Sequence, residues 1–197
     1  MSGFTTKKEV KNKIDLGAKV ASYPMPVTLI GANVMEKANF LAAAWFMAAA
    51  ISPPKVTAAL GKAHYTNQGI KENKTFSVCI PSEDMVKATD YCGLVSGFKA
   101  DKSEVFDVFY GKLKTAPMIS ECPVNLECSL DKVIDNVSHD IFIGEIVSTY
   151  TEEKYLTAGV VDIKKIKPLM LSLNDRLYYA LGEPKAKAWE SGKNYKS

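Results

Sequence analysis

Arginine is the residue that this sequence most clearly lacks. Arg176 is the only arginine in 197 residues, so nearly all of the 25 Lys and Arg are lysines. Arginine supplies the flat, two-pronged donor that grips carboxylates and phosphates. A site built on arginine is therefore disfavoured, and any phosphate must be held by lysine, hydroxyl groups, histidine or backbone N–H.

Metal ligands are also sparse. The chain has two histidines and four cysteines, and Cys122 and Cys128 lack the short spacing of a zinc knuckle. We therefore expect no metal site. So few cysteines do not form a disulfide scaffold, which favours reduced thiols and a cytoplasmic location.

No segment has the features of a membrane span or a secretory signal. The longest apolar run covers residues 40–51, whereas a helix needs about 20 apolar residues to cross a bilayer. Residues 1–20 are rich in lysine and lack the apolar core of a signal peptide. A net charge of +3 is too small, by itself, to indicate a nucleic-acid or membrane surface.

Three common catalytic and nucleotide-binding motifs are missing. The sequence has no G-x-G-x-x-G after a strand, no Gly-Lys-Ser/Thr phosphate loop and no G-x-S-x-G elbow. These absences argue against a Rossmann domain, a P-loop nucleotidase and an α/β hydrolase.

The most informative stretch is residues 39–66, NFLAAAWFMAAAISPPKVTAALGKAHYT. Its apolar run predicts a buried element. Alanine favours a helix there, but the short length and the Ser-Pro-Pro stop at 52–54 suit a strand equally. Small side chains would let a flat molecule lie against the backbone. The polar groups at 61–62 and 64–66 would suit an anion.

Short β-rich segments dominate the rest of the chain. We expect strands at 27–30, 75–80, 124–131, 141–150, 160–166 and 177–181, helices at 66–73 and from 82 to about 93, a polar turn at 35–39, and a long loop at 94–117. Thr66 is the expected N-cap of the first helix. Strict alternation over 124–131 predicts one buried face and one wet face.

These elements predict a mainly β fold. Many short strands without βαβ alternation indicate an antiparallel barrel with a few helices. The length suits one domain over residues 1–197. Residues 1–20 would form a basic, solvated arm, and residues 185–197 a tail or short helix.

Six motifs, in this order, resemble the flavin reductase-like proteins of the FMN-binding split-barrel fold, with flavoredoxin the nearest branch. They are P-x-P-V at 24–27, NFLAAAWF at 39–46, DYCG…SG…DK at 90–102, ECPVNLEC at 121–128, HDIFIGE at 139–145 and YYALGE at 178–183. The resemblance implies a six-stranded antiparallel Greek-key barrel. It also implies a homodimer with non-covalent FMN near the subunit interface.

The resemblance also implies which residues hold the flavin. They are Asn39, Ala43, Ala44, Trp45, Phe46, Met47, Leu60, Gly61, His64, Thr66, Ser96, Gly97 and Lys102. Ala43–Phe46 would flank the isoalloxazine ring; without the resemblance, Trp45 and Phe46 would be ordinary core aromatics. Leu60, Gly61, His64 and Thr66 would meet the phosphate, since Gly exposes backbone N–H and a helix N-terminus favours an anion.

Three further residues have alternative interpretations. Many relatives carry arginine at the position of His64, so Lys102 is a candidate for the missing positive charge; the alternative is a solvated lysine. His139 aligns with the histidine of a Gly-Asp-His signature, although Val137 and Ser138 replace the other two residues. It could orient a nicotinamide or donate a proton, or merely close a strand turn. Cys92 is interpreted as a buried, unreactive thiol.

Three functions follow. The first is an oxidoreductase that passes electrons from a donor such as NAD(P)H to flavin or a downstream acceptor. The second is a flavoredoxin-type carrier, reduced by a protein partner instead of NAD(P)H. The third is a non-redox barrel that binds another flat ligand.

Overall fold

The structure is a computed structural model that describes residues 13–21, 23–193 and 195. Its main feature is an antiparallel sheet with the strand order β3-β2-β6-β9-β10-β5-β4. The strands are β2 (Thr28–Val34), β3 (Lys37–Ala43), β4 (Phe46–Ile51), β5 (Pro54–Gly61), β6 (Thr75–Ile80), β9 (Val124–Asp135) and β10 (His139–Thr151).

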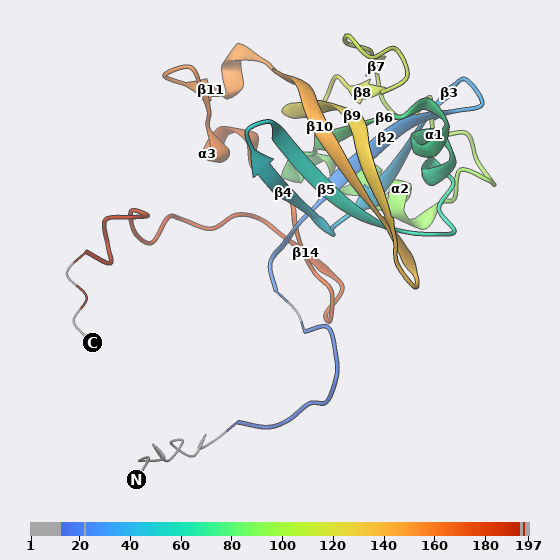
Figure 1. The fold of residues 1–197 in the computed structure, drawn as a ribbon. Helices are drawn as coiled ribbons and strands as arrows, with labels where there is room; N and C mark the ends of the chain where they lie inside the picture. The colour runs from blue at the N-terminus through green and yellow to red at the C-terminus, as the bar shows by residue number, and fades with distance from the viewer. Residues whose placement is uncertain (1–12, 22, 194, 196–197) are drawn as a thin grey trace.

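The sheet curls into a barrel that is split along one seam. β3 and β5 contact each other without forming a ladder, so the six strands from β3 to β5 enclose the core and β4 continues beyond them. β2 pairs with β6, and β5 pairs with β10. Pairs between strands that do not follow each other in the sequence are typical of a Greek key. The predicted antiparallel split barrel is confirmed, and β4 adds a seventh strand to the six that were expected (Figure 1).

β9 and β10 form the longest ladder, running from Asp135 opposite Asp140 to Val124 opposite Thr151. Two register shifts bend it, one of them next to Gly144. A Cβ on Gly144 would lie 2.4 Å from the ring of Phe76, which is fully buried in the barrel core. Glycine therefore allows the bent strand to close over that ring.

A second apolar cluster fills the space between the barrel and its helical cover. The short helix η1 (Glu83–Met85) leads into α2 (Val86–Leu94), and Met85, Ala88 and Cys92 pack against Phe40 of β3. These three residues form one apolar face of this helical segment. The loop that follows contains only β7 (Val108–Phe109), which pairs with β8 (Met118–Ile119).

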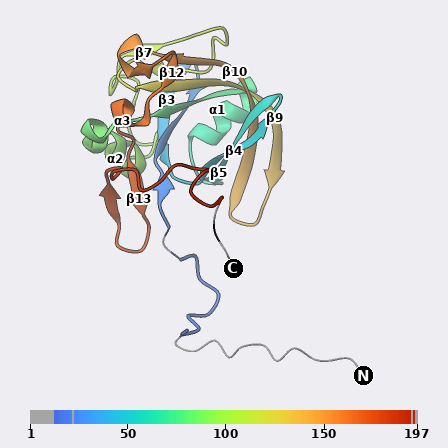
Figure 2. The same ribbon diagram turned by 90° about the vertical axis from the view of Figure 1, so that its left-hand side faces the viewer.

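The remaining elements lie around the barrel. They are α1 (Thr66–Asn73), η2 (Glu153–Tyr155), β11 (Leu156–Thr157), β12 (Val160–Val161), α3 (Ile163–Ile166), and a small sheet of β1 (Met25–Pro26), β13 (Met170–Ser172) and β14 (Leu177–Tyr179). The β9–β10 and β13–β14 hairpins project from the same end of the barrel, where both chain ends also leave it (Figures 1 and 2).

Several sequence expectations need correction. The run 40–51 is strand, not helix, but it is not buried throughout, because β4 is an edge strand and Ile51 is 95% exposed. The turn expected at 35–39 is confined to Met35 and Glu36, so Asn39 lies within β3. Residues 163–166 form α3 and not strand.

The predicted wet face of β9 is also partly wrong. Glu127 points to that face, yet it is fully buried. Its carboxylate accepts hydrogen bonds from the backbone N–H of Lys112 and Leu113 and from the hydroxyl of Tyr150. The long loop before β8 therefore covers the outer face of β9, and Glu127 anchors it.

The chain ends add little regular structure. Residues 13–20 of the expected basic arm are exposed coil, and residues 1–12 lie outside the described residues. In the expected tail, the described residues 185–193 and 195 form turns and coil without a helix; residues 194, 196 and 197 are also outside the described residues.

Candidate functional site

A pocket of about 140 Å³ opens where the end of β3 meets the end of β5. Its walls are Ala42, Ala43, Ala44, Trp45, Ala59, Leu60, Gly61, His64 and His139, with Met25, Leu171 and Leu173 from the small sheet. Seven residues predicted from the sequence thus converge from three separate segments. Because much of the wall is alanine and glycine, a flat ring could approach the backbone closely.

Trp45 and His139 face each other at this pocket. Their ring centroids are 4.7 Å apart and the planes are inclined by 36°. The carbonyl of Trp45 accepts a 2.9 Å hydrogen bond from the N–H of Ala59, which fixes the bend between β3 and β4. His139 opens β10 directly opposite Gly61, and its Nδ1 is 2.8 Å from the hydroxyl of Ser138.

Gly61 brings the two imidazoles together. A Cβ built on Gly61 would lie 3.2 Å from Nε2 of His64 and 3.9 Å from Nε2 of His139. His64 lies on the rim and is exposed. Partial desolvation lowers its pKa below the ordinary value, and the charges of His139 and Lys102 lower the pKa further. His64 is therefore neutral at pH 7.

The start of α1 adjoins this corner. Thr66 is buried, and its hydroxyl accepts a 2.7 Å hydrogen bond from the amide of Asn39. Thr66 is not the N-cap: Tyr65 holds that position and makes no capping bond through its side chain. Since the Thr66 oxygen is the acceptor from Asn39, its own proton can be donated to a ligand.

Asn67 is a residue that the sequence reasoning missed. It is buried, and its side-chain N–H₂ donates to the carbonyl of Gly61 at 3.0 Å. Its Oδ1 is buried and has no protein donor in the described part of the chain. A buried acceptor without a donor is costly, so Asn67 is a candidate to receive a ligand hydroxyl. The sequence signal for Asn67 was its position directly after Thr66, a residue predicted to bind flavin.

Lys102 is only 2% exposed, so the alternative of a solvated lysine is wrong. Its Nζ donates to the carbonyls of Val95 at 3.0 Å and Cys92 at 3.4 Å, at the C-terminal end of α2. Among the described residues no carboxylate forms an ion pair with it. Burial lowers its pKa. A buried ammonium held only by carbonyl dipoles is suited to bind an anion.

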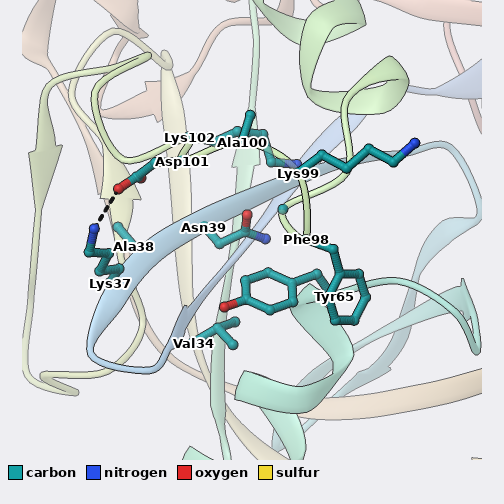
Figure 3. A pocket seen from close by; sticks show the side chains of 11 residues that line it. Val34, Lys37, Ala38, Asn39, Tyr65, Phe98, Lys99, Ala100, Asp101 and Lys102 are labelled. Atoms are coloured by element: carbon teal, nitrogen blue, oxygen red, sulfur yellow. Dashed lines mark hydrogen bonds and ion pairs between the residues drawn. The ribbon is translucent and has the colours of Figure 1, made fainter.

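A second pocket, of about 310 Å³, is lined by Asn39 and Lys102, with Lys37, Tyr65 and residues 97–101 around it (Figure 3). Gly97 lines it and packs so closely that a Cβ there would lie 2.4 Å from Cδ1 of Tyr65 and 2.5 Å from Oδ1 of Asn39. Asn39, Gly97 and Lys102, expected from the sequence to touch the flavin, therefore line this second pocket and not the alanine-rich one.

Four expected flavin residues line neither pocket: Thr66, described above, and Phe46, Met47 and Ser96. Phe46 packs against the barrel core, Met47 is 64% exposed on β4, and Ser96 is exposed, with its hydroxyl accepting from the N–H of Phe98. Successive strand residues point to opposite faces, which explains why Phe46 and Met47 diverge from each other.

Cys92 is fully buried, and burial raises its pKa to about 11. The structure thus agrees with an unreactive thiol. The described residues contain no cluster of three or more His, Cys, Asp or Glu that could hold a metal ion. Within the same residues, every helix is too short or too polar to span a bilayer.

Comparison with known proteins decides the family. Residues 20–178 match the flavin reductase like domain. The chain belongs to the flavin reductase-like family. The resemblance predicted from the sequence is confirmed. Because this is a flavin-binding family, the comparison supports a flavin as the expected cofactor.

Individual members of this family show where the chain stands within it. Flavoredoxin from Methanosarcina acetivorans is 49% identical, with a TM-score of 0.91 over 92% of this chain and 98% of that one. Flavoredoxin of Desulfovibrio vulgaris (Miyazaki F) is 37% identical, with a TM-score of 0.85 over 92% of this chain and all of that one. An NADH-dependent FAD reductase from Streptomyces globisporus is 25% identical over 70% of this chain and 76% of its own.

The residues present fit a flavin. The alanine-rich pocket offers a surface for the ring, and Asn67, whose Oδ1 is a buried acceptor without a donor in the described residues, is bonded through its N–H₂ to Gly61 in the pocket wall. The Thr66 hydroxyl and the buried Lys102 ammonium supply donors for a phosphate.

Proposed function

We propose that the chain binds FMN non-covalently and acts as an electron carrier of the flavoredoxin type. The observation that carries the proposal is the pairing of a small-residue pocket with a buried ammonium that has no carboxylate partner in the described structure. When bound, FMN would supply reversible electron uptake and release. The protein would supply binding, orientation and shielding from water.

At the phosphate end, the proposed ligands are Lys102, Thr66, Gly61 and the rim residue His64. Lys102 contributes a fixed positive charge, whereas the lowered pKa of His64 makes it a neutral hydrogen-bonding group at pH 7. Thr66 can donate its hydroxyl proton while Asn39 holds its oxygen in place. This arrangement replaces the arginine that the chain lacks.

At the ring end, Ala43, Ala44 and Leu60 would lie against the flavin, and Trp45 with His139 would border it. His139 is half-buried and reaches the pocket. It is therefore the proposed group for orienting a nicotinamide or holding a proton near the ring.

A second candidate function is an NAD(P)H-dependent flavin reductase. The position of His139 in the pocket wall favours it, as does the sequence relation to the Streptomyces reductase. The greater similarity to two flavoredoxins favours the carrier. The two functions differ in the donor that reduces the flavin.

The test is an anaerobic visible spectrum of the protein with FMN, before and after NADH or NADPH. The carrier predicts a bound-flavin spectrum that resists both nucleotides and bleaches with dithionite. Rapid bleaching by either nucleotide would select the reductase and identify its donor. If the protein retained no flavin, both functions would be refuted.

We also propose that the functional form is a homodimer. A pocket of about 140 Å³ is smaller than the roughly 300–1,000 Å³ of typical ligand pockets, so one chain would leave much of the ring uncovered. The neighbouring strand β4 exposes Met47 and Ile51 to solvent. A second copy seated on this strand would bury both the apolar edge and the ring.

Sedimentation of the wild type and of Met47→Lys tests the dimer. We expect a dimeric wild type, and a variant that shifts toward monomer and loses FMN in parallel. A fully monomeric wild type that retains FMN would contradict the proposal.

A further inference from the structure

A third cavity, of about 480 Å³, is formed by β13, β14 and the coil before β1. Residues 23–24, 170–172 and 179–182 line it, and most of them are apolar. We call it the hairpin groove. It shares only Leu171 with the ring pocket and no residue with the pocket of about 310 Å³. The motif YYALGE at 178–183 contributes nothing to the ring pocket, yet it supplies four of the residues that line this groove.

The hairpin groove leaves large side chains in contact with water. Tyr23 is 53% exposed, Tyr179 47% and Leu181 44%. The Tyr179 hydroxyl already donates to the carboxylate of Asp175 at 2.7 Å, so the ring of Tyr179 is the part that remains available. Exposed apolar side chains that line a hollow mark an interaction surface. The volume lies within the roughly 300–1,000 Å³ of pockets that receive a whole ligand or side chain.

The C-terminal tail carries an aromatic side chain that its own chain does not cover. Trp189 is 94% exposed, although tryptophan is highly buried on average. It lies in a turn closed by the N–H and the hydroxyl of Ser191, which donate to the carbonyl of Lys187 at 3.2 and 2.7 Å. In the described part of the chain, the ion pair of Lys164 with Glu183 is the last bond between the tail and the rest of the protein. The tail thus presents an indole to solvent on a turn that is held by its own bonds.

The tail begins at the rim of its own groove but does not return to it. Gly182 lines the groove, and residues 183–193 run away from the β13–β14 hairpin, on the side of the barrel that carries β4 (Figures 1 and 2). Trp189 follows Gly182 by seven residues, a length of chain that spans up to about 25 Å when extended. The proposed second copy sits on β4. In a two-fold dimer this direction therefore carries each tail towards the other copy.

We propose that Trp189 of each copy seats in the hairpin groove of a second copy of this chain. The indole packs among the exposed rings of Tyr23 and Tyr179 and the side chain of Leu181, where an aromatic side chain removes about 150–250 Å² of surface from water. The exchange is reciprocal, as the closed symmetry of a two-fold dimer requires. This inference rests on the proposed homodimer, and it adds a second contact in which the partner supplies the residue that fills the groove.

Disulfide trapping in the full chain loaded with FMN tests the exchange. Ala180 lines the groove and Ala188 precedes Trp189, so Ala180→Cys combined with Ala188→Cys in one chain keeps both contacting surfaces. The four native cysteines are buried, so they do not compete. We expect mild oxidation to give a covalent dimer on a non-reducing gel, with peptide mapping that joins position 180 to position 188. Adding Trp189→Ala to this protein should abolish most of the covalent dimer.

Val137→Cys combined with Ala188→Cys is the matched control. Val137 is 94% exposed in the turn between β9 and β10, outside the groove, so this protein should stay monomeric on the gel. A disulfide between positions 180 and 188 of the same chain would overturn the proposal, because the tail would then fill its own groove. The absence of a link between these positions, or a yield that Trp189→Ala leaves unchanged, would overturn it as well.

Sedimentation separates this inference from the proposed homodimer. Trp189→Ala should raise the Kd of the dimer by on the order of 30-fold, the effect of losing one interface tryptophan, and Trp189→Phe should retain most of the affinity. If the wild type dimerises and Met47→Lys does not, but Trp189→Ala leaves the Kd unchanged, the tail exchange is refuted and the dimer through β4 stands. A monomeric wild type would refute both, while FMN binding is judged separately by its absorbance.

Discussion

Replacement of Lys102 by methionine tests the central electrostatic argument. Methionine keeps most of the volume of the lysine stem and removes only the ammonium. In the FMN-free protein, the change relieves a desolvated charge but also removes the bonds to the carbonyls of Cys92 and Val95. These two effects offset each other, so we expect the free energy of unfolding to change by less than about 1 kcal/mol.

The effect on FMN should be much larger. A hydrogen bond between charged groups contributes about 1.5–3 kcal/mol, and 1.4 kcal/mol corresponds to about a tenfold change in Kd. We therefore expect Lys102→Met to weaken FMN binding by about 10- to 150-fold. Because Lys102 is 2% exposed, salt should screen this loss much less than it would for a surface lysine.

Riboflavin makes the assay specific, since it has the same ring without the phosphate. Quenching of flavin fluorescence gives Kd for both ligands in wild type, Lys102→Met and the control Lys87→Met. Riboflavin affinity should be equal in all three proteins, and FMN affinity should fall only in Lys102→Met. An unchanged ratio of FMN to riboflavin affinity in Lys102→Met would refute the assignment of Lys102 to the phosphate.

Three other predictions follow from buried contacts. Glu127→Gln should lower the free energy of unfolding by about 1–3 kcal/mol. It should also speed amide exchange at Lys112 and Leu113, because their N–H groups donate to the Glu127 carboxylate. Unchanged exchange would contradict the role of Glu127 in anchoring the loop. Gly97→Ala should weaken FMN binding by about 10-fold because its Cβ overlaps Tyr65 and Asn39, and equal affinity would contradict this. Cys92, with its pKa raised to about 11, should resist alkylation at pH 8 and react faster as the pH rises toward 11; rapid native labelling would contradict the burial.

Much of the fold could be predicted because its signals are local. Strict alternation along residues 124–131 predicted β9, and the β-rich run 141–150 predicted β10, which pairs with it. The order of short strands then indicated an antiparallel barrel. The alanines at 42–44 and the polar cluster at 61–66 indicated a ring pocket beside an anion site, and the structure brings both to one corner.

What failed depends on contacts between distant segments. Strand alternation predicts that Glu127 faces solvent. It is buried because the loop at Lys112 and Leu113, more than ten residues earlier, covers it and donates two N–H groups to its carboxylate. For Lys102 the sequence left two alternatives, a phosphate ligand and a solvated lysine, and only the burial of its side chain against the carbonyls of Cys92 and Val95 excludes the second. A charged side chain that is buried with specific partners cannot be recognised from its own sequence neighbourhood, because its partners lie elsewhere in the chain.

The exposure of β4 is a different kind of disagreement. Hydrophobicity predicted that residues 40–51 are buried, yet Met47 and Ile51 are exposed in the single chain. An apolar pattern shows that a surface should be covered, but not which molecule covers it. The shallow ring pocket beside Trp45 would likewise leave part of a bound flavin ring uncovered in the single chain. If one second copy covers both, the sequence pattern was informative about the assembly, and FMN retention and dimer formation must be lost together in Met47→Lys.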